Sequence, residues 1–206
     1  MEASTAPWLV VGLGNPGPEY EWTPHNLGFL TVDRLALSNK IRVDRKDSKA
    51  LLGVGSFSGK ELLLAKPQTF MNVSGPAVKA LMEKHAVPAS NLIVVYDELD
   101  LPWTAVRVRP KGSAAGHNGV DSVIRSIGTM EFPRVRLGIS TGERPGHKAG
   151  SGATFVLGPF KKAQMQELDE LLDHAARAVE SIIAEGVEKS MTKFNRRAQG
   201  LNKEEE

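Results

Sequence analysis

Hydrophobic residues along the chain follow two patterns in turn, one typical of strands and one typical of helices. Short strand-like stretches occur at residues 8–13, 50–57, 61–66, 91–96, 105–109 and 134–139. The stretch Asn91 to Tyr96 is a continuous run rich in β-branched residues, which is typical of a strand buried on both faces. In the stretch 105–109, apolar and basic residues alternate, which predicts one face carrying arginines.

Apolar residues recur at helical spacing between these strands, at residues 24–37, 75–85, 120–127, 161–185 and 187–194. Strands that alternate with helices predict an α/β fold. We expect a single domain with a mixed, mostly parallel sheet flanked by helices in three α/β/α layers. Its core spans about residues 8–196, with tails at 1–7 and 197–206. Residues 141–153 are rich in glycine, proline and charge, which predicts a surface loop.

The composition is that of a folded domain, with 206 residues of which 41% are hydrophobic and 24% are charged. The chain has no cysteine, which excludes disulfides, thiolate nucleophiles and cysteine-type zinc sites. This fits the reducing cytoplasm, where we expect the protein to act. No apolar run approaches the roughly 20 residues of a membrane span, so no membrane association is expected. The net charge of +2 says little about nucleic acid.

A glycine-rich turn at residues 12–17 matches the Gly-x-Gly-x-x-Gly pattern of dinucleotide-binding proteins. In that motif the glycines open a helix directly after the strand, whereas here Pro16 and Pro18 follow and the predicted helix begins only near Thr23. The acidic residue required at the end of a second strand is also missing, because Asp33 falls within a helical pattern. We therefore expect no nucleotide cofactor.

Several polar residues stand where strands end or helices begin. Asn15 and Asp97 follow predicted strands, and His25, Asn72 and Asn118 lie at or just before predicted helix starts. Such positions share one rim of an α/β sheet. The positive end of a helix dipole disfavours imidazolium, so His25 can act as a general base oriented by Asp97. Uncharged amides that both donate and accept hydrogen bonds suit peptide groups and ribose hydroxyls.

Five segments of the sequence carry a family resemblance. These are Gly12–Gly17, Thr23–Asn26, Phe70–Gly75, Tyr96–Pro102 and Gly116–Gly119. In this order and spacing, over about Leu9 to Phe194, the chain resembles bacterial peptidyl-tRNA hydrolases. The resemblance implies a monomeric, tRNA-binding hydrolase that needs no cofactor or metal. Such an enzyme cleaves the ester between a peptide and the 3′ ribose of tRNA, which returns tRNA from stalled ribosomes to translation.

The resemblance also assigns roles to individual residues. It implies that His25 is the catalytic base and that Asp97 orients it. The residues expected to bind the substrate are Asn15, Tyr20, Met71, Asn72, His117 and Asn118, and those expected to meet tRNA phosphate are Arg109, Arg136 and Lys111. One segment departs from the family pattern, because residues 112–115 (Gly-Ser-Ala-Ala) replace a more glycine-rich version. This departure concerns the flexibility of the loop rather than the chemistry.

Two alternatives of other classes stay open at this point. Asp97, Glu98 and Asp100 could form the metal site of a phosphodiesterase or nuclease. Alternation along an extended segment would point Glu98 away from Asp97, however, and no His-x-x-x-His pair completes a ligand set. A non-catalytic RNA-binding protein on the same scaffold, like an organellar splicing factor, is the other alternative. The presence of His25, Asp97 and three asparagines favours an enzyme.

Overall fold

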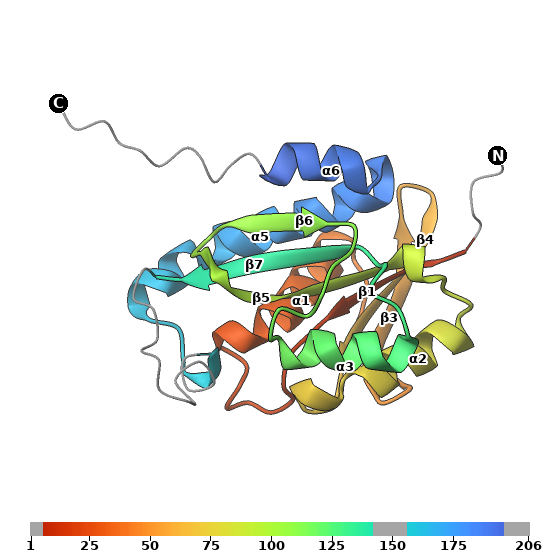
Figure 1. Cartoon of the computed structure of the whole chain (residues 1–206), viewed down its shortest axis with the longest axis horizontal. Coiled ribbons are helices and arrows are strands. Elements are labelled where there is room, and N and C mark those ends of the chain that lie inside the picture. Colours follow the sequence, from red (N-terminus) through yellow and green to blue (C-terminus); the bar gives the residue numbers. More distant parts are fainter. Residues whose placement is uncertain (1–5, 142–155, 196–206) are drawn as a thin grey trace.

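The computed structural model describes residues 6–141 and 156–195, which form a seven-stranded sheet in the order β2-β3-β4-β1-β5-β7-β6 (Figure 1). The central strands β4, β1, β5 and β7 are parallel, whereas β2, β3 and β6 run antiparallel to their neighbours at the two sides. The strands are β1 (Trp8–Gly12), β2 (Arg45–Asp47), β3 (Ala50–Phe57), β4 (Lys60–Pro67), β5 (Leu92–Pro102), β6 (Val106–Arg109) and β7 (Arg134–Ser140).

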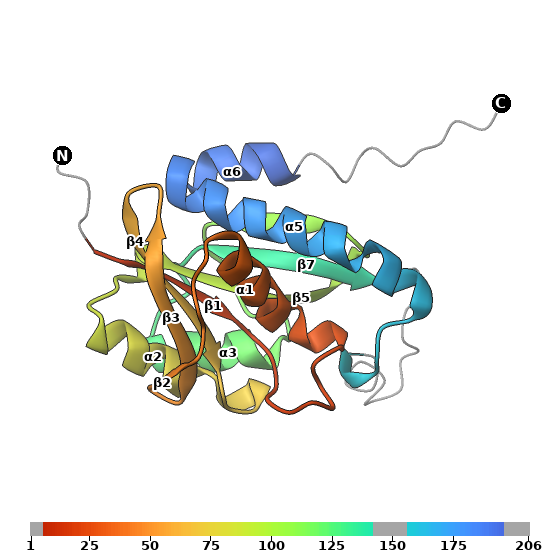
Figure 2. The ribbon, with the colours of Figure 1, turned by 180° about the vertical axis from the view of Figure 1, so that it is seen from behind.

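Helices cover both faces of the sheet, which confirms the predicted three layers (Figures 1 and 2). One face packs against α1 (Leu27–Ser38) and α5 (Lys162–Glu185), and the other against α2 (Gly75–Lys84) and α3 (Asn118–Ile127). The last helix, α6 (Val187–Phe194), contacts α5 and β6. Three short 3-10 helices are η1 (Pro24–Asn26), η2 (Met71–Val73) and η3 (Ala89–Asn91). No helix in the described part of the chain is long and apolar enough to cross a membrane.

The first five residues of β5, Leu92–Tyr96, are continuously hydrophobic because both faces of the strand are covered there. Ile93 and Val95 pack into the core on the α1 and α5 side, whereas Leu92, Val94 and Tyr96 pack on the α2 and α3 side. Successive side chains of a strand point to opposite faces, so a strand covered on both faces needs apolar residues at every position. The predicted strand ends at Tyr96, but β5 continues to Pro102.

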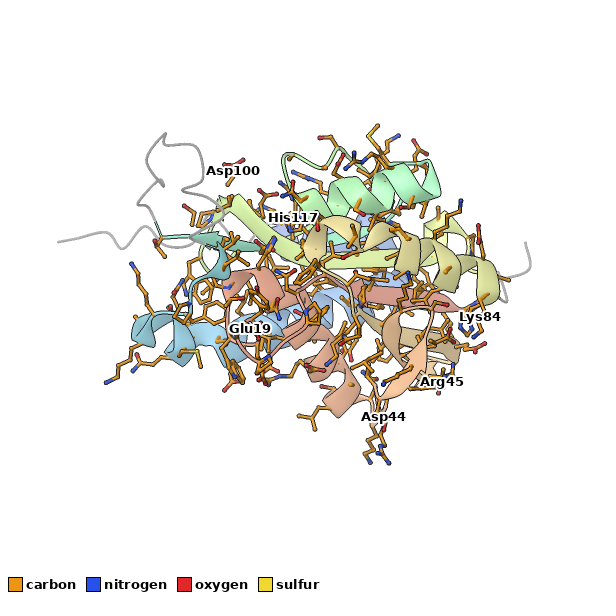
Figure 3. All side chains as sticks on the ribbon, turned by 90° about the horizontal axis from the view of Figure 1, so that it is seen from below. Glu19, Asp44, Arg45, Lys84, Asp100 and His117 are labelled. Carbon is orange, nitrogen blue, oxygen red and sulfur yellow. The ribbon has the colours of Figure 1, made fainter. Side chains whose placement is uncertain are left out.

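The edge strand β2 was not predicted, because its three residues are Arg45, Lys46 and Asp47 and only Asp47 is buried. The Asp47 carboxylate accepts hydrogen bonds from Lys84 Nζ (2.9 Å), Ser48 Oγ (2.9 Å) and His85 Nε2 (3.2 Å). The bond from Lys84 is the main reason why the pKa of Asp47 is lowered to about 2. In Figure 3, Arg45 and Lys84 lie on the opposite side of the molecule from Asp100, and His117 lies between them.

Strand β1 and helix α1 approach each other so closely that two glycines are required. A Cβ atom on Gly28 would lie 2.4 Å from the backbone N and O of Leu13 and from the carbonyl oxygen of Val95. A Cβ atom on Gly12 would lie 2.1 Å from the carbonyl oxygen of Gly28. This close approach places η1, which carries His25, beside the end of β1 and in contact with β5. Gly12, part of the apparent dinucleotide motif, therefore serves packing.

Replacing Gly28 with alanine tests this close packing. We expect Gly28→Ala to lower the free energy of unfolding by about 2–3 kcal/mol, because the methyl group meets backbone atoms that cannot move away. Gly128→Ala is the control: its Cβ meets nothing within 4 Å, and its φ of +76° leaves only backbone strain of roughly 1 kcal/mol. Urea denaturation of both variants measures the difference, and equal losses would contradict the packing argument.

Candidate active site

A cleft of about 600 Å³ opens beyond the end of β1, beside residues 97–100 of β5, and most of the predicted substrate and catalytic residues line it. Strands β1 and β5 are parallel neighbours, and the last residue of β1, Gly12, lies opposite Val95, so the chain that follows β1 passes close to Asp97 of β5. The predicted residues that line the cleft are Asn15, His25, Met71, Asn72, Asp97, His117 and Asn118. Tyr20 was expected in the cleft but is not among the described residues that line it.

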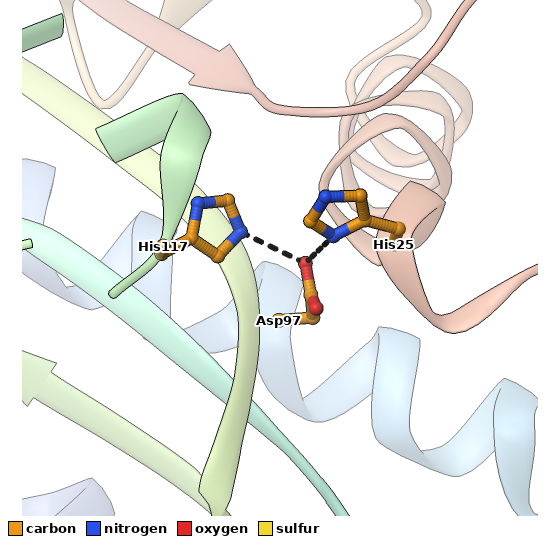
Figure 4. A group of neighbouring side chains, drawn as sticks. All are labelled: His25, Asp97 and His117. Carbon is orange, nitrogen blue, oxygen red and sulfur yellow. Dashed lines mark hydrogen bonds and ion pairs between the residues drawn. The ribbon is translucent and has the colours of Figure 1, made fainter. Parts of the chain in front are cut away.

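The centre of the cleft is a buried carboxylate shared by two imidazole rings (Figure 4). Asp97 Oδ1 lies 2.8 Å from His25 Nδ1 and 3.0 Å from His117 Nε2. The side chain of Asp97 is only 2% exposed, whereas that of His25 is 13% exposed. His25 comes from η1 and His117 from the residue that precedes α3, so the carboxylate joins the two helical layers.

The hydrogen-bond partners determine which nitrogen of each neutral ring carries the proton. His25 donates through Nδ1–H to Asp97, which leaves its Nε2 without a proton. In His117 the order is reversed, because Nδ1 accepts the backbone N–H of Val120 (3.3 Å) and Nε2–H donates to Asp97. Both nitrogens of His117 are thus engaged within the protein. His117 also lines the cleft, and its role in substrate binding stays a prediction.

The charge of Asp97 is stabilised by its two neighbours. Burial raises the pKa of Asp97, but the adjacent ring of His117 and the hydrogen bonds from His117 and His25 together outweigh this effect. The net pKa of Asp97 lies below its usual range. The carboxylate is therefore ionised at neutral pH and can stabilise a positive charge on an imidazole ring.

Asn15 is fixed by a residue that the sequence analysis did not single out. Asn26 Oδ1 accepts from the backbone N–H of Asn15 (2.8 Å), and Asn26 Nδ2 donates to the carbonyl oxygen of Asn15 (3.0 Å). Asn15 Oδ1 in turn accepts the backbone N–H of Met71 (2.8 Å), so its Nδ2–H₂ group is left as a donor. The available sequence signal for Asn26 was its position directly after His25 in the segment Thr23–Asn26.

The other two asparagines present their amides to solvent. Asn72 lies in η2, and Asn118 is the first residue of α3. Both side chains are exposed in the cleft, and within the described residues neither makes a hydrogen bond. Thr23 precedes the 3-10 helix η1, and its hydroxyl donates to the carbonyl oxygen of Tyr20 (2.8 Å) rather than accepting a hydrogen bond from the helix start. Pro24 instead begins the 3-10 helix η1, which leads into α1.

The three basic residues expected to meet tRNA phosphate differ in their surroundings. Arg136 donates through Nε (2.9 Å) and Nη2 (2.5 Å) to Glu98, a buried residue that lines the cleft. Lys111 pairs with Glu131 at 3.0 Å on the surface. Arg109, on β6, is exposed and forms no ion pair with another described residue. Arg109 is thus the most accessible of the three.

One group of side chains in the described part of the chain has the spacing of a metal site. The ligand atoms of His25, Asp97 and His117 lie within 4.8 Å of one another, whereas Glu98 pairs with Arg136 instead. A neutral imidazole that binds a metal through Nε2 carries its proton on Nδ1. In His117 that proton would point at the N–H of Val120, so the donor set does not fit a metal ion.

Comparison with known proteins identifies the family. The sequence profile described as peptidyl-tRNA hydrolase matches residues 9–203. The chain belongs to the peptidyl-tRNA hydrolase family. It is 63% identical to the peptidyl-tRNA hydrolase of Solibacter usitatus, with 96% of this chain and 99% of the relative covered.

More distant members of the family agree with this assignment. The peptidyl-tRNA hydrolase of Koribacter versatilis is 48% identical, with 92% of each chain covered. The crystal structure of the peptidyl-tRNA hydrolase of Acinetobacter baumannii superposes with a TM-score of 0.85 at 31% identity, over 95% of this chain and 97% of that chain. The mixed α/β fold is therefore the fold of the family.

The low pKa of Asp97 predicts a specific loss of stability in acid. Below about pH 4 the unfolded chain takes up a proton on Asp97 that the folded chain does not, so the wild type loses stability by up to ~1.4 kcal/mol per pH unit. Asp97→Asn lacks this proton uptake. We expect the stability difference between wild type and Asp97→Asn, measured by urea unfolding, to shrink as the pH falls from about 5 to about 3.

The matched control is Asp44→Asn, which removes an exposed carboxylate that pairs with Arg42 at the surface. Its stability curve is expected to run parallel to that of the wild type. A constant difference between wild type and Asp97→Asn over the same pH range would show that the charge of Asp97 does not stabilise the fold.

Proposed function

We propose that this chain hydrolyses the ester bond between peptide and tRNA in peptidyl-tRNA, with His25 as general base. The observation that supports this most strongly is the hydrogen bond from His25 Nδ1 to the buried Asp97, which leaves His25 Nε2 as a proton acceptor in the cleft. Membership in the peptidyl-tRNA hydrolase family supports the same substrate.

In the first step a water molecule attacks the ester carbonyl carbon while His25 Nε2 removes its proton. The imidazolium that forms keeps its Nδ1–H bond to Asp97, and the ionised carboxylate stabilises the new positive charge. A base of this kind typically contributes about 10²–10⁴-fold in rate. The second donor to Asp97, His117, fixes the position of the carboxylate from the opposite side.

The negative charge that develops on the carbonyl oxygen needs a hydrogen-bond donor. Asn15 Nδ2 suits this role, because the two bonds with Asn26 fix the backbone of Asn15 and the bond from the Met71 N–H to Oδ1 orients its side-chain amide. A preorganised side-chain donor is worth roughly 2.7–4 kcal/mol in such a transition state. The tetrahedral intermediate then collapses: the bond to the ribose oxygen breaks, and the proton on His25 passes to that oxygen. The products are free tRNA and the peptide acid.

The exposed amides of Asn72 and Asn118 are suited to the peptide part of the substrate. Each offers a donor and an acceptor that no described residue occupies, and a peptide group requires both. This arrangement favours substrates whose α-amino group is blocked by a peptide bond. A free, charged α-amino group would replace that peptide group and leave the amides without matching partners.

The tRNA part of the substrate is expected to extend over β6 and β7. Arg107 and Arg109 of β6 lie directly opposite Arg136 and Arg134 of β7, so four arginines share one face at this edge of the sheet. Arginine is suited to phosphate because its guanidinium group is planar and always charged. We propose Arg109 as the main phosphate contact. Arg136 and Lys111 contribute once they exchange their ion pairs with Glu98 and Glu131 for contacts with phosphate.

The two alternative functions have weaker support. A carboxylate metal site built from Asp97, Glu98 and Asp100 is disfavoured, because Glu98 is engaged with Arg136 and Asp97 with two histidines. A purely RNA-binding protein would not need an oriented imidazole beside open amides. From the family resemblance, we further infer that the protein acts as a monomer in the cytoplasm.

The role of His25 is tested by hydrolysis of N-acetylated aminoacyl-tRNA, measured as release of free tRNA. We expect His25→Ala to lower kcat by about 10²–10⁴-fold, because the proton acceptor is lost. His174→Gln, which changes a histidine on α5, is the matched control and should retain wild-type activity. Treatment of the wild type with EDTA is expected to have no effect.

Three results would contradict this proposal in different ways. Equal activity of wild type and His25→Ala would show that His25 is not the general base. Loss of activity with EDTA would support a metal-dependent enzyme instead. Tight binding of RNA by the wild type without any turnover would instead indicate the RNA-binding alternative.

The proposed phosphate contact predicts a change in salt dependence. We expect Arg109→Gln to weaken tRNA binding and to reduce the slope of log affinity against log salt by about 0.7–0.9, the value for one lost phosphate contact. Lys79→Gln, on the exposed side of α2, is the control and should keep the wild-type slope. Fluorescence anisotropy with labelled tRNA at several salt concentrations measures both, and an unchanged slope in Arg109→Gln would exclude the contact.

A further inference from the structure

Arg134 is a buried cation that the proposed reaction does not use. It is only 1% exposed, although it begins β7 among the arginines of that sheet edge. No carboxylate of the described residues lies within ion-pair distance of it, whereas its neighbour Arg136 pairs with Glu98. A buried charge is costly unless it is well hydrogen-bonded, so the bonds that Arg134 makes indicate its role.

The guanidinium group of Arg134 joins two loops. Its Nη1 donates to the carbonyl oxygen of Ser113 (3.1 Å), and its Nη2 donates to the carbonyl oxygen of Met130 (3.0 Å). The same Met130 oxygen also accepts the backbone N–H of Gly112 (3.4 Å). The guanidinium carbon lies 4.2 Å from the centre of the Phe132 ring, which covers one face of the group. Arg134 thus fastens residues 112 and 113 to the segment before β7.

Residues 112 and 113 lead directly to His117, which together with His25 bonds to Asp97. The next carbonyl after Ser113, that of Ala114, accepts the backbone N–H of His117 (2.9 Å). Between them, Ala115 has a φ of +47°, which is disfavoured for a residue with a side chain. A loop in this conformation needs external support, and its last residue, His117, is the one that must reach Asp97.

A second path runs from Arg134 through Tyr96. In the parallel pair of β5 and β7, Arg134 lies opposite Val94 and Arg136 opposite Tyr96, so Arg134 and Tyr96 are on the same face of adjacent strands. Burial raises the pKa of the Tyr96 phenol, and the nearby charge of Arg134 opposes this effect. The ring of Tyr96 meets the ring of His117 edge-on, with the centres 4.9 Å apart. Arg134 is therefore linked to His117 both through the backbone of the loop and through an aromatic contact.

We propose that Arg134 is a positioning residue, whose guanidinium fork holds residues 112–117 so that His117 meets Asp97. Two donors in a rigid plane bind the two carbonyl oxygens at once, which the ammonium group of lysine does not reproduce. The link to activity rests on the proposed hydrolysis, but the effect on the loop does not.

The test compares Arg134→Lys and Arg134→Gln with the wild type in two measurements. The first is hydrogen exchange of the His117 backbone amide, for which we expect about tenfold less protection in both variants. The second is hydrolysis of N-acetylated aminoacyl-tRNA, for which we expect kcat to fall by about 10- to 100-fold while KM changes less than about threefold. Arg125→Gln, which removes an exposed arginine from α3, is the control for both measurements.

A double variant separates positioning from general loss of stability. If Arg134 acts through His117, Arg134→Lys combined with His117→Ala should be no slower than His117→Ala alone. Independent, multiplying losses would overturn the proposal. An effect confined to KM, with a smaller salt slope for tRNA, would also overturn it, because Arg134 would then be a phosphate contact.

The exchange measurement decides the proposal even if the chain does not hydrolyse peptidyl-tRNA. Unchanged protection of the His117 amide in Arg134→Lys would show that the loop does not depend on the fork. If Arg134→Gln fails to fold, Arg134→Lys keeps the buried charge and provides the same comparison.

Discussion

One oxygen atom of Asp97 accepts hydrogen bonds from two histidines, and the arrangement of the site depends on this shared acceptor. The carboxylate lies on β5 in the middle layer, His25 approaches from the α1 layer, and His117 approaches from the α3 layer. One hydrophobic cluster lies on each face of the sheet, and at the cleft this polar contact joins the segments that cover the two faces. Buried polar networks of this kind specify one arrangement only when every member is satisfied.

The surrounding structure keeps each member of the network in place. Gly12 and Gly28 allow β1 and α1 to touch, which brings η1 and His25 to the end of β5. Asn26, adjacent to His25, holds the backbone of Asn15 by two hydrogen bonds, so the segment that carries the proposed oxyanion donor is bonded to the 3-10 helix that carries the base. The side of His117 is supported by the helix start of α3 and by the loop that Arg134 fastens.

Much of this architecture could be predicted from the sequence because the packing is periodic. The apolar run of β5 and the helical spacing in α5 each reflect a regular relation to the core. Helix α5 was found close to its true limits, whereas residues 97–102 of β5, which are not a continuous apolar run, were not predicted as strand. The edge strand β2 was missed because it has almost no buried side chain. Its position depends on contacts of Asp47 with Lys84 and His85, which lie far away in the sequence.

In the candidate site, too, the location of the residues could be predicted but their individual contacts could not. The proximity of His25, Asp97 and the asparagines followed from the rule that strand ends share an edge. The partners of individual atoms did not follow: that Arg136 is paired with Glu98 and that both nitrogens of His117 are engaged depends on side-chain directions in three dimensions. Sequence pattern places residues on a rim, but it does not show which hydrogen bonds they have already made.

The most direct test of the account is the position of the protons on the two histidines. Long-range ¹H–¹⁵N NMR of the imidazole rings, assigned with His25→Gln and His117→Gln, reports which nitrogen of each neutral ring is protonated. The account predicts that at neutral pH His25 carries its proton on Nδ1 with Nε2 bare, and that His117 carries its proton on Nε2. A His25 ring protonated mainly on Nε2 would contradict it, because no acceptor would then face the substrate.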